Sequence, residues 1–179
     1  MNPEKAKKKL GLVQVYTGNG KGKTTASLGL AFRASGCGLK TIVVQFLKPS
    51  EEYGEQIAAR ETGLFEIISL GLDHMGTDVP REEDIRLAKE ALSRLSEILS
   101  SGKYDLVIAD EINVAMSWEL LAPSEVIAVL EKRAPNTEVV LTGRGAPEEI
   151  KDYADLVTEM KLIKHPFDRG VGARRGIEF

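Results

Sequence analysis

The chain carries, close to its N-terminus, the glycine-rich stretch Thr17-Gly18-Asn19-Gly20-Lys21-Gly22-Lys23-Thr24-Thr25. An apolar run at residues 12–16 precedes it and is typical of a buried strand, while residues 26–33 have the pattern of a helix. A glycine-rich turn between a strand and a helix is the context of a phosphate-binding loop, or P-loop. The stretch therefore predicts that this end of the chain binds a phosphorylated ligand.

The residue types of this loop explain how it would hold phosphate. Glycines let successive backbone N–H groups point inward, and the following helix N-terminus favours an anion. Lys23 adds a mobile charge, and the Thr24 hydroxyl is suited to magnesium. Two features depart from the general pattern: Thr17 replaces its first glycine, and Lys21 puts a second cation inside the loop. The alternative is a flexible glycine turn with solvated lysines.

Length and composition limit what this loop can serve. The 179 residues suffice for one domain with a substantial core, and the 42% hydrophobic and 28% charged residues are those of a globular protein. A net charge of −3 argues against a general nucleic-acid binder, and no apolar run is long enough to cross a membrane. The single cysteine, Cys37, excludes an intrachain disulfide, so we expect a cytoplasmic protein.

The chain divides into a short arm and one domain. Residues 1–9 hold four lysines and little that could be buried, which predicts a mobile basic arm. The alternative is an arm that closes over a bound polyanion or onto a partner subunit. Residues 10–179 form the single P-loop domain, including the basic, glycine-rich tail at 164–179, which suits a flap over an anionic ligand.

Strands and helices alternate along this domain. The expected strands are residues 12–16, 40–47, 65–70, 104–111, 137–142 and 156–163. Helices are expected at residues 26–33, within 48–63, and at 80–102, 123–130 and 146–154, and residues 113–121 are helical or irregular. This order predicts a three-layer α/β domain with a mainly parallel sheet, the RecA-like P-loop fold.

A second chemical landmark is the strand that ends in Asp110 and Glu111. An acidic pair at the carboxyl end of an apolar strand, downstream of a P-loop, is typical of the Walker B group. Asp110 would lie close to Thr24, so these two residues would hold one Mg²⁺ ion, directly or through water. The alternative is a strand that simply ends in charged residues. Arg144 follows another strand and is expected at the same sheet edge, where it would contact phosphate or a second substrate, unless it is only a surface arginine after a turn.

Several segments in this order resemble the P-loop type of ATP:corrinoid adenosyltransferase. They are residues 17–25 with the unusual Lys21, Val43-Val44-Gln45-Phe46 with Lys48, Ala109-Asp110-Glu111-Ile112-Asn113, Thr142-Gly143-Arg144, residues 154–160, Lys164-His165-Pro166-Phe167 and Gly176-Ile177-Glu178. The resemblance covers nearly everything after Lys9. It also accounts for the missing first glycine, since the family uses the same Thr-Gly-Asn-Gly-Lys-Gly-Lys-Thr form.

The resemblance implies that a corrinoid Co(I) attacks the 5′ carbon of ATP and expels the whole triphosphate. Lys21, Lys23 and Thr24 would then stabilise the leaving group with the loop amides and Mg²⁺ held by Thr24, Asp110 and Glu111. This reaction requires the protein to orient the two substrates and to stabilise the charge of the leaving triphosphate, and it does not require acid–base groups. Arg33 matches a family position near the nucleoside. The resemblance further implies a homodimer and a partner reductase that supplies the electron.

The loop from residue 71 to residue 76 departs from the family pattern. Well-known members place Phe and Trp there, which help to hold the cobalt four-coordinate, whereas this chain has Leu72, Asp73, His74 and Met75. We hypothesise that Leu72 and Met75 offer an apolar face to the corrinoid with His74 at its edge; the alternative is that His74 coordinates cobalt. Two other functions stay open: a conventional P-loop ATPase or phosphotransferase, and a nucleotide-dependent switch or corrinoid carrier.

Overall fold

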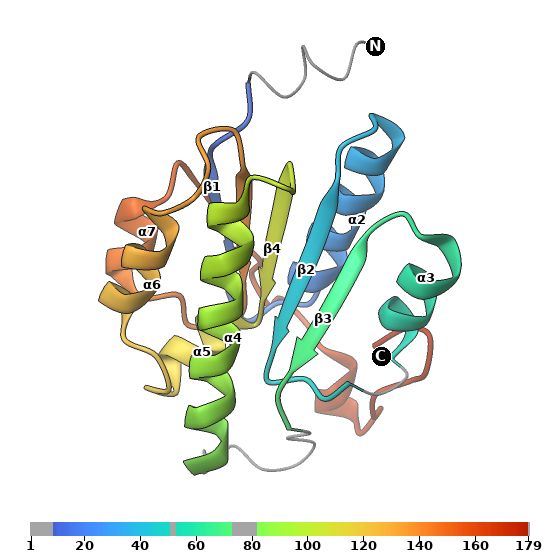
Figure 1. Cartoon of the computed structure of the whole chain (residues 1–179). Helices are drawn as coiled ribbons and strands as arrows, with labels where there is room; N and C mark the ends of the chain where they lie inside the picture. Colours follow the sequence, from blue (N-terminus) through green and yellow to red (C-terminus); the bar gives the residue numbers. More distant parts are fainter. Residues whose placement is uncertain (1–8, 51–52, 73–81, 179) are drawn as a thin grey trace.

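A computed structural model describes residues 9–50, 53–72 and 82–178 (Figure 1). Six strands form one sheet in the order β3-β2-β4-β5-β1-β6, and each neighbouring pair is parallel. The strands are β1 (Val13–Thr17), β2 (Thr41–Phe46), β3 (Glu66–Leu70), β4 (Leu106–Asp110), β5 (Glu138–Thr142) and β6 (Leu156–Glu159). The predicted α/β fold with a mainly parallel sheet is confirmed.

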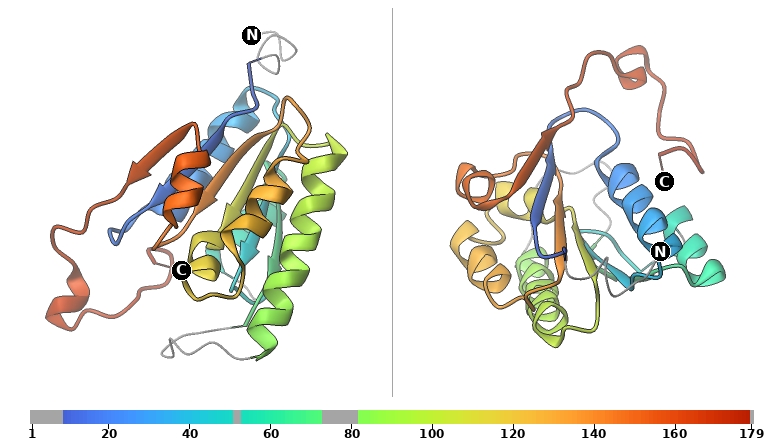
Figure 2. Two further views of the ribbon diagram at one scale, coloured as in Figure 1. Left: turned by 90° about the vertical axis from the view of Figure 1, so that its left-hand side faces the viewer. Right: turned by 90° about the horizontal axis from the view of Figure 1, so that it is seen from above.

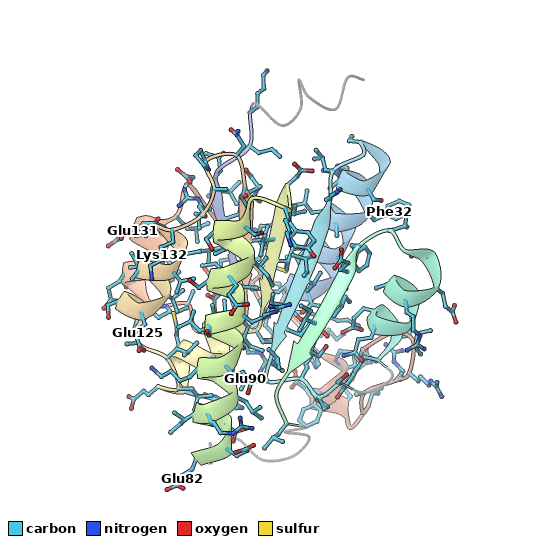
Figure 3. The ribbon with its side chains drawn as sticks, in the orientation of Figure 1. Phe32, Glu82, Glu90, Glu125, Glu131 and Lys132 are labelled. Carbon is cyan, nitrogen blue, oxygen red and sulfur yellow. The ribbon has the colours of Figure 1, made fainter. Side chains whose placement is uncertain are left out.

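Helices cover both faces of this sheet, which gives the three expected layers. They are α2 (Lys23–Gly36), α3 (Gly54–Thr62), α4 (Glu82–Ser101), α5 (Ile112–Ser117), α6 (Pro123–Leu130) and α7 (Glu148–Tyr153), with a 3₁₀ turn, η1 (Pro166–Arg169), in the tail. Figure 2 shows α2 and α3 on one face and α4, α6 and α7 on the other. Charged side chains such as Glu82, Glu90 and Glu125 project from the outer surface of that second layer (Figure 3).

The central strands explain why the sheet needs both layers. All six residues of β2 are buried, as expected for a parallel strand that is covered on both faces. Val43 packs in the cluster beneath α2. Ile42 and Val44 point the other way and pack with the buried side of α4. Burial of such aliphatic side chains contributes about 1.5–3 kcal/mol each, so the sheet is the core of the domain.

Helix α4 follows its predicted pattern with one exception. Acidic residues fill its first turn, and its buried face includes Ala88, Leu92, Leu95 and Leu99, as the helical spacing predicts. Ile85 shares that spacing but is 45% exposed. It lies one turn from the start of the described helix, where the helix reaches past the sheet. None of the helices in the described ranges is both long and apolar enough to span a membrane.

The last strand is shorter than the sequence predicts. We expect it to run from residue 156 to residue 163, but β6 ends at Glu159. Past that point the backbone of Met160 bonds to the loop: its N–H donates to Thr17 and its carbonyl accepts from Gly20. The chain therefore follows the P-loop instead of continuing the sheet.

The strand order decides which side chains meet at the carboxyl edge of the sheet. β5 lies between β1, which leads into the P-loop, and β4, which ends in Asp110. β2 is the other neighbour of β4. The carboxyl ends of parallel strands form the usual ligand-binding crevice of an open α/β sheet, so residues that follow β1, β2, β4 and β5 converge there.

Candidate functional site

The P-loop connects β1 to α2 in a conformation that requires glycine. Gly18 has φ 94°, and a Cβ atom there would lie 2.6 Å from the carbonyl oxygen of Met160. Gly22 has φ 118° and directly precedes the first residue of α2. Backbone angles of this kind are unfavourable for residues with a Cβ atom. Thr17, which stands in place of the first glycine, is buried, and its hydroxyl accepts a hydrogen bond from Ala146 N–H.

Lys23 lies inside this loop. Its Nζ donates to the carbonyl oxygens of Gly18 at 2.9 Å and Gly20 at 2.8 Å, and the residue is buried. Burial lowers the pKa of Lys23, and the Arg144 charge lowers it further, against the opposing effect of Glu111. The ammonium thus sits among backbone carbonyls at the start of α2, where a phosphate group would replace them as its partner.

Asp110 is the centre of a hydrogen-bond network at the end of β4. One oxygen accepts from the hydroxyls of Thr24 at 2.8 Å and Thr142 at 2.6 Å. The other accepts from the Lys48 ammonium at 2.9 Å and the Gln45 amide at 3.3 Å. The carboxylate is fully buried, so these four donors replace water around it. Thr142 reaches it because β5 lies between the loop strand and β4.

Burial and charge act against one another at this carboxylate. Burial alone would raise the pKa of Asp110, but Lys48 and the hydroxyls of Thr142 and Thr24 hold it below its usual value. Burial alone would likewise lower the pKa of Lys48, but the negative charges of Asp110 and Glu55 raise it above the ordinary value. Both partners therefore stay charged, as a buried ion pair whose separate members would each be costly.

Glu111, the next residue, is a carboxylate whose nearby cations, Lys48, Lys23 and Arg144, do not outweigh the effect of its burial. Its backbone is left-handed, with φ 63°, and its N–H donates to the Thr142 hydroxyl at 3.1 Å. Burial and then the nearby charge of Asp110 raise the pKa of Glu111 to about 7. The hydrogen bonds found among the described residues leave its carboxylate oxygens without a donor. Two neighbouring carboxylates and the Thr24 hydroxyl form an oxygen donor set that suits Mg²⁺.

A cavity of about 400 Å³ opens beside these groups and is lined by Thr24, Thr25, Lys48, Glu111 and the tail residue Glu178, among others. Its volume lies within the usual range for small-molecule sites. A larger cavity, of about 670 Å³ between α3 and β3, has none of the loop residues in its lining. We therefore place the candidate site at the smaller cavity, where the charged groups converge.

The C-terminal tail returns to the loop at this cavity. Lys21 Nζ donates to the Glu178 carboxylate at 2.8 Å and to the carbonyl oxygen of Ile177 at 3.0 Å. Arg174 also bonds to Glu178, and hydrogen bonds from Arg174 and Lys21 hold the pKa of Glu178 well below its ordinary value. The tail thus meets the second loop cation, which is compatible with the predicted flap.

The chain is similar to known proteins along nearly its whole length. A family described as ATP:corrinoid adenosyltransferase BtuR/CobO/CobP matches residues 9–179. This chain belongs to that family. A corrinoid adenosyltransferase from Sinorhizobium sp is 39% identical over 172 residues, which are 94% of this chain and 80% of the relative. One from Escherichia coli (strain K12) is 36% identical over 170 residues, 94% of this chain and 86% of the relative.

Two further similarities fit this assignment. The corrinoid adenosyltransferase CobA of Salmonella typhimurium is 36% identical over 175 residues, 97% of this chain and 88% of the relative. A solved structure of the KaiC-like protein PH0186 from Pyrococcus horikoshii OT3 matches with a TM-score of 0.54 and 17% identity, over 86% of this chain and 73% of that one. The latter likeness supports the fold alone, and that fold is the expected RecA-like type.

Not every residue that the sequence singles out in this family member lies at the loop. Arg33 is exposed in the last turn of α2, about 14 Å along the helix axis from Thr24. Its role near the nucleoside stays a prediction. Arg144 is exposed after β5, and its charge lowers the pKa of both Lys23 and Glu111. Leu72 is half-buried just after β3, while His74 and Met75 fall outside the described residues.

The structure also adds residues to which sequence reasoning gave no role. Gln45 and Lys48 appear in the family resemblance only as a matching segment, and Glu55 and Thr142 have no function assigned. All four belong to the hydrogen-bond network around Asp110. Gln45, Lys48 and Thr142 share one signal, which is their place at or soon after the end of a parallel strand, and this brings them to the same edge. Glu55 lies in α3, beyond the loop that follows β2, so the same argument does not predict its position.

Proposed function

We propose that this protein transfers the 5′-deoxyadenosyl group of ATP to the Co(I) centre of a corrinoid, in cobalamin biosynthesis or salvage. The cobalt electron pair forms the new bond to the 5′ carbon. The bond between that carbon and the triphosphate oxygen breaks, and its electron pair leaves with intact triphosphate. The observation that carries this proposal is a P-loop with two lysines next to a cavity lined by Thr24 and Thr25, in a chain that matches the adenosyltransferase family throughout residues 9–179.

The described side chains support such a role because they stabilise charge. Lys23 at the base of the loop and Lys21 at its rim are available to the departing phosphates. The loop amides add donors without charge, except that of Gly20, which donates to Met160. The nucleophile belongs to the corrinoid, so the protein needs to hold the two substrates in line and to stabilise the leaving group. In this proposal Glu178 releases Lys21 when the phosphates arrive.

Magnesium belongs to the same proposal. The half-buried Glu111, with a pKa of about 7, lies next to the fully buried Asp110, and a bound cation would stabilise both carboxylates in their charged form. Thr24, Asp110 and Glu111 would hold the ion, which would supply positive charge next to the triphosphate. Glu111 has the clearer access, because four donors already surround Asp110.

The remaining parts of the proposal concern the surroundings of the reaction. We place it in the cytoplasm, on the composition with its single cysteine. A reductase that supplies the electron and a second copy of the chain in a homodimer both come from the family resemblance. Leu72, His74 and Met75 would meet the corrinoid in the manner described for the loop at residues 71–76.

One incubation separates this function from the others. Protein, Mg²⁺, ATP and chemically reduced corrinoid are combined, and the phosphate product is identified by ion chromatography. Tripolyphosphate together with a light-sensitive adenosylcorrinoid is the expected result. ADP would indicate a conventional ATPase or phosphotransferase in which Glu111 positions water or a substrate hydroxyl. Binding of both ligands without any product would indicate a switch or carrier.

A further inference from the structure

Lys48 is a half-buried cation to which the proposed reaction gives no role. It lies two residues after β2, its side chain is 20% exposed, and it lines the same cavity as Thr24 and Thr25. Its Nζ donates to Asp110 at 2.9 Å and to Glu55 at 3.2 Å. Lysine side chains are mostly exposed, so the partial burial of Lys48 needs a physical reason.

The backbone that carries Lys48 is strained, which is the first reason to look for a function. Leu47 has φ 57°, the left-handed region that residues with a branched side chain seldom adopt. Gly71 packs under this turn so closely that a Cβ atom would lie 2.5 Å from both Leu47 Cα and Lys48 N. Such strain persists only where the surroundings hold it, and it is frequent at functional sites. Here the turn carries Lys48 into the cavity.

The second reason is that Lys48 lies close to Thr24, the P-loop residue whose hydroxyl would bind the magnesium ion of the triphosphate. Asp110 accepts from Lys48 with one oxygen and from Thr24 with the other. A single carboxylate therefore separates the Lys48 ammonium from the Thr24 hydroxyl, in the first turn of α2. The four-carbon lysine stem is flexible, so its head can move by that distance without any change in the backbone.

We propose that Lys48 is a third cation of the triphosphate site, beside Lys21 and Lys23, and that it passes from Asp110 to the phosphates when nucleotide binds. This inference rests on the proposed function. A triphosphate carries several negative charges against the single charge of Asp110, so the phosphates attract the ammonium more strongly. Glu55 remains as its second partner and keeps the side chain at the cavity.

The competing explanation is that Lys48 only neutralises Asp110 and never touches substrate. The two explanations differ in the effect of removing Lys48 from a protein in which Asp110 is replaced by Asn. If Lys48 only neutralises Asp110, its removal from that variant does not change the affinity for phosphate. If Lys48 binds phosphate, its removal weakens binding whether residue 110 is Asp or Asn.

The test measures binding of tripolyphosphate to the whole protein by isothermal titration calorimetry, first with Mg²⁺ and then with EDTA. Lys48→Met removes the charge and keeps most of the stem. We expect binding to weaken at least tenfold in both buffers, with part of it restored in Lys48→Arg. Lys89→Met is the matched control, since Lys89 pairs with Glu125 on the exposed side of α4, and its binding should equal that of wild type.

A variant pair keeps the test valid if Lys48→Met alone fails to fold. Asp110→Asn is compared with Asp110→Asn/Lys48→Met. In the double variant both members of the ion pair are replaced, so neither charge is left without its partner. The same tenfold loss between these two is expected, and equal binding within twofold would overturn the inference. If wild type itself binds no tripolyphosphate, the proposed function fails too. If wild type binds and Lys48→Met binds equally, only the role of Lys48 is lost.

Discussion

Asp110→Asn is the substitution for which the structure gives the most definite energetic expectation. The amide keeps the shape of the side chain, and its oxygen can still accept from the hydroxyls of Thr24 and Thr142. Its NH₂ group, however, would face the Lys48 ammonium and the Gln45 amide, which now donate to a carboxylate oxygen. Three donor groups would then meet, with Glu55 as the remaining acceptor for Lys48 and Gln45, and the half-buried lysine would lose its closest counter-charge.

Removal of one member of a buried ion pair costs about 3–5 kcal/mol. Glu55, which accepts from Lys48 at 3.2 Å, still offsets part of that charge, so we expect the lower end, about 3 kcal/mol. For a chain of this length about 1 kcal/mol shifts the melting temperature by about 2–4 °C, so the variant should melt about 6–12 °C lower.

Urea denaturation of the nucleotide-free protein at pH 7 measures this difference directly. Asp152→Asn, the same change at an exposed position of α7, is the control and should stay within about 0.5 kcal/mol of wild type. The folded-state pKa of Asp110 is lowered, so its contribution is present above the unfolded pKa of about 4 and is lost as the pH falls. The gap between variant and wild type should therefore narrow in acid. A loss under about 1 kcal/mol at pH 7 would refute the reasoning.

Three other substitutions test separate parts of the site. The folded-state pKa of Glu111 is raised to about 7, so its contribution to stability is complete below its unfolded pKa and is lost as the pH rises toward 7. The urea midpoint of wild type should therefore fall between pH 5 and pH 8, and Glu111→Gln should abolish that fall. The same dependence of the midpoint on pH in the variant would contradict the assignment. Gly71→Ala should destabilise by about 1–3 kcal/mol through its clash with the turn at Leu47, whereas Gly29→Ala, in open space within α2, should stabilise by about 0.5–1 kcal/mol. Lys23→Ala should lose most adenosyl transfer while its circular dichroism stays that of wild type; near-normal turnover would count against the role given to the loop.

Much of the fold could be predicted because its signals are local. The strand, glycine loop and helix around residues 17–25 follow from periodicity and glycine placement, and the burial of Ala88 to Leu99 on α4 follows from helical spacing. The end of β6 could not be predicted in the same way. Residues 160–163 retain an apolar pattern, but the backbone of Met160 is held by Thr17 and Gly20, which are more than a hundred residues away in sequence.

The candidate site likewise contains residues that local motifs predict and contacts that depend on the tertiary structure. The loop residues and Asp110 were predicted from motifs that fix their chemistry within a few positions. The network around Asp110 depends on strand order, and the sequence alone does not say that β5 lies between β1 and β4. That order brings Thr142 to Asp110. The strain at Leu47 is likewise invisible in the sequence, because it arises from the close packing of Gly71 against a turn more than twenty residues earlier.

The Asp110 carboxylate gathers its four donors from α2, β2, the turn after β2 and β5, so no fragment of the chain contains the whole arrangement. A ligand that needs this arrangement binds only the assembled domain and draws the folding equilibrium toward it by mass action. At a free nucleotide concentration a hundred times the dissociation constant, the gain is about 2.7 kcal/mol. The resistance of this protein to proteolysis should therefore rise and fall with the supply of ATP.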